Sequence, residues 1–293
     1  MHPMATITAW VQGARLRTLP NAVAPVVVGA GAAAELDAFS WLRSTLALIV
    51  ALALIVGVNY ANDYSDGVRG TDDDRVGPLR LVASGTAEAK SVLAAALSSF
   101  VLACVAGLAL VILSGAWWLL AVGAACVGGA WFYTGGTRPY GYAGFGEIAV
   151  FVFFGLAAVL GTVYVQAGTV SLLALGSAVA VGAFSSAVLL ANNLRDIPSD
   201  AEAGKRTLAV KLGDRHTRTL YLALIVLPFA VTIAMAFALP PVLLASVTAL
   251  ALLRPARTIL SRATGRALIP VLADTGLALL LWAVVTGAVL AAA

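Results

Sequence analysis

Residues 42–70 read LRSTLALIVALALIVGVNYANDYSDGVRG, an apolar run that ends directly in asparagines and aspartates. A run of about 20 apolar residues is what a helix needs to cross the hydrocarbon core of a bilayer. The polar residues Asn59, Asn62 and Asp66 follow it without a linker. Polar side chains at such a depth cost free energy unless they are paired, and they are candidates for function by default. The stretch therefore predicts a membrane helix whose end carries a polar site.

The same apolar pattern recurs along the whole chain and predicts an all-α, polytopic membrane protein with one domain over residues 1–293. The nine predicted transmembrane helices span residues 19–34, 42–61, 91–113, 116–134, 147–167, 170–191, 220–239, 240–253 and 271–292. Of the 293 residues, 61% are hydrophobic and 11% are charged, with a mean hydropathy of +0.98. A soluble domain carries about 25% charged residues. This composition excludes an ordinary soluble enzyme, a disordered chain and a nucleic-acid-binding module.

The basic residues orient the predicted helices. With nine helices, all of the 18 lysines and arginines except Arg43 fall before the first helix or in the connections after helices two, four, six and eight. Loops rich in lysine and arginine stay on the cytoplasmic side of a membrane. We therefore expect a multi-pass protein of the plasma membrane, with its N-terminus and these connections in the cytoplasm. The connections on the other side of the membrane are too short to hold a further domain.

Two of the cytoplasmic connections are unusually polar. Residues 59–90 read NYANDYSDGVRGTDDDRVGPLRLVASGTAEAK, and residues 192–215 read NNLRDIPSDAEAGKRTLAVKLGDR. Together they hold 10 of the 14 acidic residues. They follow the second and sixth helices, so both emerge on the same face. The four-residue spacing of Asn192 and Asp196 repeats that of Asn62 and Asp66, which puts each pair on one helix face. Asp196 and Asp200 have the same spacing, but Pro198 between them disfavours helix at Ile197, so this pair is expected to straddle a break.

Paired acidic helix ends beside basic residues indicate a particular chemistry. Carboxylate and amide oxygens suit Mg²⁺, which is typically held by one or two carboxylates and substrate phosphates. Arginine and lysine bind the remaining phosphate oxygens. The residues therefore predict a site for Mg²⁺ and a diphosphate whose apolar remainder lies among the helices, that is, a lipid diphosphate. The chain has no Walker-type loop, which argues against an ATPase.

The two segments resemble the paired aspartate motifs of the UbiA superfamily of intramembrane aromatic prenyltransferases. Residues 62–66, NDYSD, resemble the first motif, NDxxD, and residues 196–200, DIPSD, resemble the second, DxxxD. The longer strings, together with residues 14–29 and 140–155, are similar to the branch that uses 1,4-dihydroxy-2-naphthoate. Gly70 departs from the pattern, because many relatives in other branches have a further aspartate there. Asp72 or Asp73 is expected to take its place.

The resemblance implies nine helices around a central cavity that is capped by the cytoplasmic loops. It also implies Mg²⁺-dependent transfer of a polyprenyl group from a polyprenyl diphosphate to 1,4-dihydroxy-2-naphthoate. This reaction would release diphosphate and CO₂ and give demethylmenaquinone. The expected metal ligands are Asn62, Asp63, Asp66, Asn192, Asp196 and Asp200. Asp66, Asp196, Asp200 and Asp72 are the expected catalytic residues. The expected diphosphate-binding residues are Arg80, Arg138, Lys205 and Arg206.

The acceptor and the prenyl chain need a pocket as well. The residues expected to line it are Asn59, Tyr60, Tyr133, Tyr142 and Glu147, with Glu147 and Asp72 as possible general bases. Two alternatives stay open. One is a related prenyltransferase that uses 4-hydroxybenzoate, haem or a chlorophyllide as the acceptor. The other is a secondary transporter, although transporters place their sites near the middle of the bilayer, whereas these carboxylates cluster at helix ends. The sequence leaves the oligomeric state open.

Overall fold

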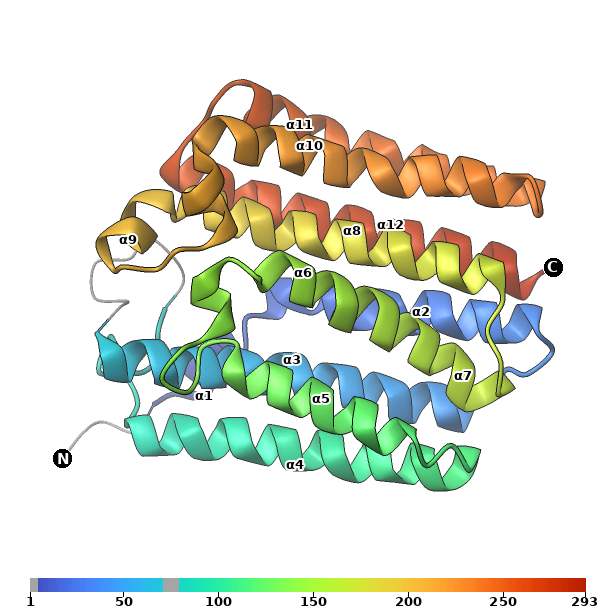
Figure 1. The fold of residues 1–293 in the computed structure, drawn as a ribbon, viewed down its shortest axis with the longest axis horizontal. Coiled ribbons are helices and arrows are strands. Elements are labelled where there is room, and N and C mark those ends of the chain that lie inside the picture. The colour runs from blue at the N-terminus through green and yellow to red at the C-terminus, as the bar shows by residue number, and fades with distance from the viewer. Residues whose placement is uncertain (1–4, 71–78) are drawn as a thin grey trace.

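The computed structural model describes residues 5–70 and 79–293, and its long helices run from one end of the molecule to the other (Figure 1). Asp72, which was predicted to be catalytic, lies outside the described residues. The first half contains α1 (Ile7–Gly13), η1 (Leu16–Thr18), α2 (Pro20–Glu35), α3 (Trp41–Arg69), α4 (Ala89–Ser114), α5 (Leu119–Phe132) and η2 (Tyr140–Ala143). The second half contains α6 (Gly146–Val150), η3 (Phe151–Leu160), α7 (Gly161–Ala167), α8 (Leu172–Arg195), α9 (Ile197–Glu202), α10 (Leu208–Ala236), η4 (Pro240–Leu252), α11 (Leu253–Leu260), η5 (Gly265–Leu268) and α12 (Ile269–Ala291).

Each of the nine predicted ranges coincides with a helical segment, which confirms the predicted all-α membrane architecture. Within the part of the chain that the structure describes, seven segments are long and apolar enough to cross a membrane. Among the described residues, α2 and α5 have only 16 and 14 residues. The total of nine crossings therefore stays a prediction. Several helices extend beyond their predicted ranges on the polar side, and the two longest extensions are those of α3, which continues to Arg69, and α10, which already begins at Leu208.

Local sequence signals set the ends of the helices that carry the polar segments. At the start of α3, the Ser40 hydroxyl accepts a hydrogen bond from the backbone N–H of Arg43, which is the usual role of an N-cap serine. Gly70 ends α3 with a φ of 71°, a left-handed conformation that favours glycine. A break near Pro198 is present but lies one residue earlier than predicted: α8 ends at Arg195, and Ile197 is already the first residue of α9, where a proline at the second position is tolerated.

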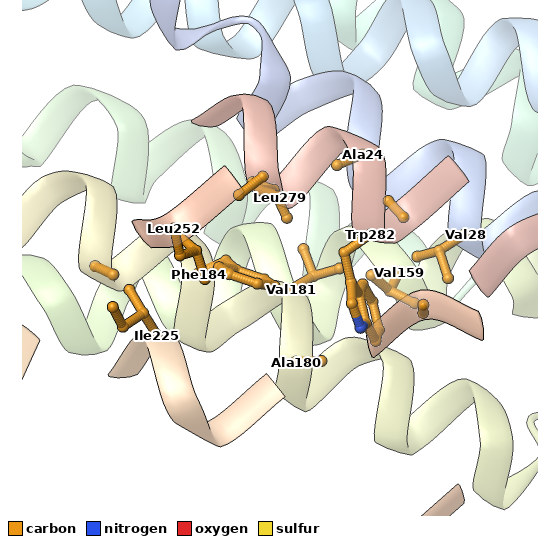
Figure 2. Close-up of a cluster of buried hydrophobic side chains, with 14 of the residues drawn as sticks. Ala24, Val28, Val159, Ala180, Val181, Phe184, Ile225, Leu252, Leu279 and Trp282 are labelled. Atoms are coloured by element: carbon orange, nitrogen blue, oxygen red, sulfur yellow. The ribbon is translucent and has the colours of Figure 1, made fainter. Parts of the chain in front are cut away.

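A large apolar core joins α2, α8, α10 and α12 (Figure 2). Phe184 of α8 lies at its centre, with ring centroids 6.2 Å from Trp282 of α12 and 6.0 Å from Phe229 of α10. The indole N–H of Trp282 donates to the Thr232 hydroxyl at 2.9 Å, so this buried polar group is satisfied. A second core cluster, around Tyr60 and Phe100, joins α1, α3 and α4.

Glycines allow the closest helix contacts in the first core. A Cβ atom on Gly31 of α2 would lie 2.2 Å from the carbonyl oxygen of Gly287 on α12. A Cβ on Gly155 of η3 would lie 2.6 Å from the Cα of Gly182 on α8. Small residues at such crossings let the two backbones approach closely. In lipid the hydrophobic effect does not drive helices together, so close van der Waals packing of this kind stabilises their contact.

The two ends of the bundle differ in polarity. The later end of α3 lies at the same end as α9, whereas the C-terminus lies at the opposite end (Figure 1). Near this opposite end, Arg43 donates to the carbonyl oxygens of Gln166 and Leu113 at 3.1 and 2.8 Å. The last carbonyl groups of a helix have no N–H partner within that helix, and Arg43 supplies hydrogen-bond donors to such groups at the ends of α7 and α4. Arg43 thus ties three helices together at the less polar end.

Candidate active site

A cavity of about 260 Å³ opens among α2, α3, α5, η3 and α8, and its polar end is built from both acidic segments. Asn62 and Asp66 reach it from α3, while Asn192 and Asp200 reach it from α8 and α9. The deeper walls are mostly apolar, with Ile55, Val58, Phe153, Phe154, Val188 and Leu189 among the lining residues. Segments 130 positions apart along the chain therefore share one cavity.

Asp66 contacts several other residues of the polar end, and its side chain is almost entirely buried. Lys205 Nζ lies 3.5 Å from Asp66 Oδ1, and Arg80 Nη2 lies 3.6 Å from Oδ2. The Tyr142 hydroxyl also donates to Oδ1, and Lys205 Nζ stands 4.8 Å from the centre of the Tyr142 ring. The first motif is thus in direct contact with the basic residue that follows the second motif.

The two asparagines of α3 are held by partners from distant segments. Asn62 Oδ1 accepts a hydrogen bond from the Thr134 hydroxyl at 2.7 Å. Asn59 Nδ2 donates to the carbonyl oxygen of Ala14 at 2.9 Å and to the Thr18 hydroxyl at 3.0 Å. Both asparagines line the cavity. Asn59 therefore fixes the link between α1 and α2 against the cavity wall.

Asp63 does not line the cavity, although the sequence predicted it as a metal ligand. Its two carboxylate oxygens accept hydrogen bonds from the backbone N–H groups of Leu81 at 2.8 Å and Val82 at 3.0 Å. One residue along a helix turns the side chain by about 100°, so Asp63 faces this loop while Asn62 faces the cavity. Asp63 thereby holds in place the segment that carries Arg80.

Asp196 is also occupied by a protein partner. Arg195 Nε lies 2.6 Å from Asp196 Oδ1, and Arg195 Nη2 donates to Oδ2 at 2.7 Å. Arg195 Nη2 also donates to Asn192 Oδ1, which joins Asn192 to the same pair. Of the second motif, Asp200 lines the cavity and Asp196 does not. The break between α8 and α9 accounts for this difference, because it turns the two aspartates apart.

Two predicted basic residues and Tyr60 also lie outside the cavity. Arg138 and Arg206 are exposed and do not line it, unlike Arg80 and Lys205. Arg206 contributes its backbone N–H, which donates to the carbonyl oxygen of Tyr142 at 2.8 Å. Tyr60 faces the α1 side of α3, where its hydroxyl donates to the Trp10 carbonyl. Successive residues point in different directions, so neighbours of a site residue need not reach the site.

The remaining predicted pocket residues come from the α5–α6 connection and from the start of α6. Tyr133 and Tyr142 line the cavity, whereas Glu147 lies behind the wall and accepts a hydrogen bond from Asn193. Tyr140, which also lines the cavity, donates its hydroxyl to the Gly129 carbonyl at 2.7 Å. Burial raises the pKa of Tyr140 to about 12, so its phenol stays neutral and does not serve as a base.

The lining residues fit a divalent oxygen-loving cation. Asp66, Asp200, Asn62 and Asn192 offer two carboxylates and two amides at one end of the cavity. Mg²⁺ commonly takes one or two carboxylates and completes its shell with water and substrate phosphates. Within residues 5–70 and 79–293, no three His, Cys, Asp or Glu side chains group closely enough to hold a metal alone. The donor set therefore suits a metal that arrives with a phosphorylated substrate.

The model of the UbiA prenyltransferase family matches residues 22–269. The chain belongs to this family. This finding confirms the resemblance drawn from the two motifs. The UbiA match covers all but the ends of the chain, and it makes the bundle of apolar helices a multi-pass membrane protein.

Curated relatives of this UbiA family member share most of its length. The 1,4-dihydroxy-2-naphthoate octaprenyltransferase of Mycobacterium tuberculosis is 59% identical over 98% of this chain and 98% of its own. The protein of the same name from Escherichia coli is 43% identical over 74% of this chain and 72% of its own.

Solved structures show the same fold. A UbiA homolog from Archaeoglobus fulgidus, bound to DMAPP and Mg²⁺, matches with a TM-score of 0.66 at 16% identity, over 96% of this chain and 98% of its own. The apo structure of a UbiA homolog from Aeropyrum pernix K1 matches with a TM-score of 0.66 at 17% identity, over 94% and 97% of the two chains.

Some residues of this UbiA site give no signal in the sequence. Thr134 contacts the first motif from 72 positions away. Asn21 and Ser185 line the cavity from α2 and α8 but belong to neither motif. Each is one polar residue in an ordinary helix or loop, and only the packing of the helices brings it to the cavity.

Proposed function

We propose that this protein transfers a polyprenyl group from a polyprenyl diphosphate to 1,4-dihydroxy-2-naphthoate. Diphosphate and CO₂ would leave, and the product would be demethylmenaquinol, the hydroquinone form of demethylmenaquinone and an intermediate of menaquinone synthesis. The observation that carries the proposal is the cavity itself, which has a polar end built from both motifs and apolar walls behind it. The names of relatives at 59% and 43% identity support this choice of acceptor.

The polar end suits the diphosphate. Lys205 and Arg80 lie within 4 Å of Asp66 and offer cationic groups for phosphate oxygens. Asn62, Asp66, Asn192 and Asp200 would hold Mg²⁺, which when bound would neutralise charge on the leaving diphosphate. Preorganised charges of this kind stabilise the transition state as negative charge builds on the leaving group.

The apolar walls suit the prenyl carbon. As the allylic C–O bond breaks, its electron pair leaves with the diphosphate, and the prenyl carbon gains cationic character. Walls that exclude water, such as Phe153 and Leu189, protect this carbon from hydrolysis. The ring carbon that bears the carboxylate then forms the new C–C bond, and the electron pair of the departing CO₂ returns to the ring. That carbon loses CO₂ and not a proton, so the step needs no base there.

Turnover by the purified protein tests the proposal. With a long polyprenyl diphosphate, Mg²⁺ and a panel of aromatic acceptors, dihydroxynaphthoate should give a prenylated product whose mass shows the loss of CO₂. Asp66→Ala and Asp200→Ala should each lower the rate by at least about 100-fold, as expected when a preorganised catalytic charge is removed. Glu202→Ala, an exposed acid on the same short helix as Asp200, should keep the wild-type rate.

Removal of the metal is a second test of the proposal. Exhaustive EDTA treatment should abolish turnover, and added Mg²⁺ should restore it. Activity that survives EDTA would contradict the metal role, and a preference for 4-hydroxybenzoate would contradict the proposed acceptor.

A further inference from the structure

A buried hydrogen-bonded pair lies beside the cavity, near the second motif. Asn193 Nδ2 on α8 donates to Glu147 Oε1 on α6 at 2.9 Å, and both side chains are buried. The Ser186 hydroxyl donates to the Glu147 carbonyl oxygen at 2.9 Å and fixes the backbone of Glu147 against α8. Asn193 lines the cavity, whereas Glu147 does not.

The pair sets the direction in which the Asn193 amide points. In the structure Glu147 Oε1 accepts the hydrogen bond from Asn193 Nδ2, and an ionised carboxylate offers only acceptor oxygens. The amide group of Asn193 must therefore turn its N–H toward Glu147, which leaves its Oδ1 as the group that can meet a ligand. Within the described part of the chain, no side chain or backbone group donates to this oxygen.

The surroundings of Asn193 suit an aromatic ring. Leu189, one helical turn before Asn193, lines the cavity, as does Tyr133 at the end of α5. Both flank Gly146, where a Cβ atom would lie 3.2 Å from Leu189 Cδ2 and 3.3 Å from the Tyr133 hydroxyl. The cavity beside Asn193 thus combines apolar and aromatic walls with one oriented hydrogen-bond acceptor. Pockets that bind small aromatic molecules have this character.

We propose that Asn193 Oδ1 accepts a hydrogen bond from a hydroxyl of the aromatic acceptor, and that Glu147 is the positioning residue that holds the amide in this direction. The inference rests on the proposed function and adds how the substrate class is recognised. A carbonyl oxygen repels the oxygens of a diphosphate, so a ring hydroxyl is its matching partner. A site built to pair with a hydroxyl discriminates strongly against an analogue without one, because a buried polar group is then left unpaired.

Methyl ethers of dihydroxynaphthoate provide the direct test. Wild-type protein should turn over dihydroxynaphthoate and lose at least about tenfold in kcat/KM with one of its two mono-methyl ethers, the loss expected for one buried hydrogen bond. In Asn193→Ala, the KM for dihydroxynaphthoate should rise by about the same factor, and the discrimination against that ether should disappear. The KM for prenyl diphosphate and the Mg²⁺ concentration for half-maximal activity should stay within about twofold of wild type.

Glu147→Gln tests the positioning role with a side chain of the same shape. A glutamine amide can face Asn193 with either its oxygen or its nitrogen, so the fixed direction is lost. The KM for the acceptor should rise, and the double variant should be no worse than Asn193→Ala alone, because Glu147 acts through Asn193. Ser177→Ala on the same helix, which removes a buried hydroxyl outside the cavity lining, should leave both KM values unchanged.

The outcomes separate the two claims. Absence of wild-type turnover with dihydroxynaphthoate would overturn the proposed function itself. Normal wild-type turnover, with the same ether discrimination in Asn193→Ala as in wild type, would overturn this inference alone. A raised Mg²⁺ requirement with an unchanged KM for the acceptor would also overturn it, since Asn193 would then act as a metal ligand.

Discussion

Asp63 shows how one residue of a motif can serve the site without lining it. Both of its oxygens accept backbone N–H groups, from Leu81 and Val82. Asparagine keeps only one acceptor oxygen, so Asp63→Asn leaves one of these N–H groups without a partner, at a cost of about 1–3 kcal/mol. The segment with Arg80 should shift, and the KM for prenyl diphosphate should rise in steady-state assays.

The Mg²⁺ requirement distinguishes this anchoring role from metal binding. At saturating prenyl diphosphate, Asp63→Asn should need nearly the wild-type Mg²⁺ concentration for half-maximal rate, whereas Asp66→Asn should need far more. If both variants raised the requirement equally, Asp63 would be a metal ligand and the anchoring role would be incorrect.

At the scale of elements, the contact between α2 and α12 depends on Gly31. In Gly31→Ala, the new Cβ would lie 2.2 Å from the Gly287 carbonyl oxygen, so the two helices must separate. Overpacking of this kind costs about 1–3 kcal/mol. Thermal unfolding in detergent should show a clearly lower melting temperature for this variant.

Gly123→Ala on α5 is the matched control, because a Cβ atom there meets nothing within 4 Å. Alanine is favoured over glycine in a helix by up to about 1 kcal/mol. This variant should therefore melt at or slightly above the wild-type temperature. Equal destabilisation by both substitutions would show that the contact between α2 and α12 is looser than the structure has it.

The elements also show where prediction from sequence stops. All nine helical ranges could be predicted from apolar runs, because a helix that crosses the hydrocarbon core must be apolar over its length. The end of α3 was predicted eight residues early, since Asn62, Asp63 and Asp66 are polar yet are buried by other segments. The two motifs could be recognised from their spacing. The position of Thr134 could not, because a contact over more than 70 positions depends on how the helices pack.

At the scale of the whole molecule, the basic residues predict that the cavity opens on the cytoplasmic side. Single cysteines test this orientation once Cys104 and Cys126 are replaced by serine. Glu202→Cys, exposed on α9, should react with a membrane-impermeant maleimide only after cells are permeabilised. Thr169→Cys, exposed in the connection between α7 and α8, should react in intact cells. The reverse labelling pattern would invert the proposed orientation.

The most direct test asks whether Asp66 and Asp200 serve one diphosphate site. Mg²⁺-dependent binding of a non-reactive thio analogue of geranyl diphosphate would be measured for wild type, Asp66→Ala, Asp200→Ala and the double variant. Each single change should weaken binding by at least about tenfold, and the double variant should lose clearly less than the product of the two, because residues that share a ligand are not additive. Wild-type affinity in either single variant, or losses that multiply as for independent sites, would contradict a shared site.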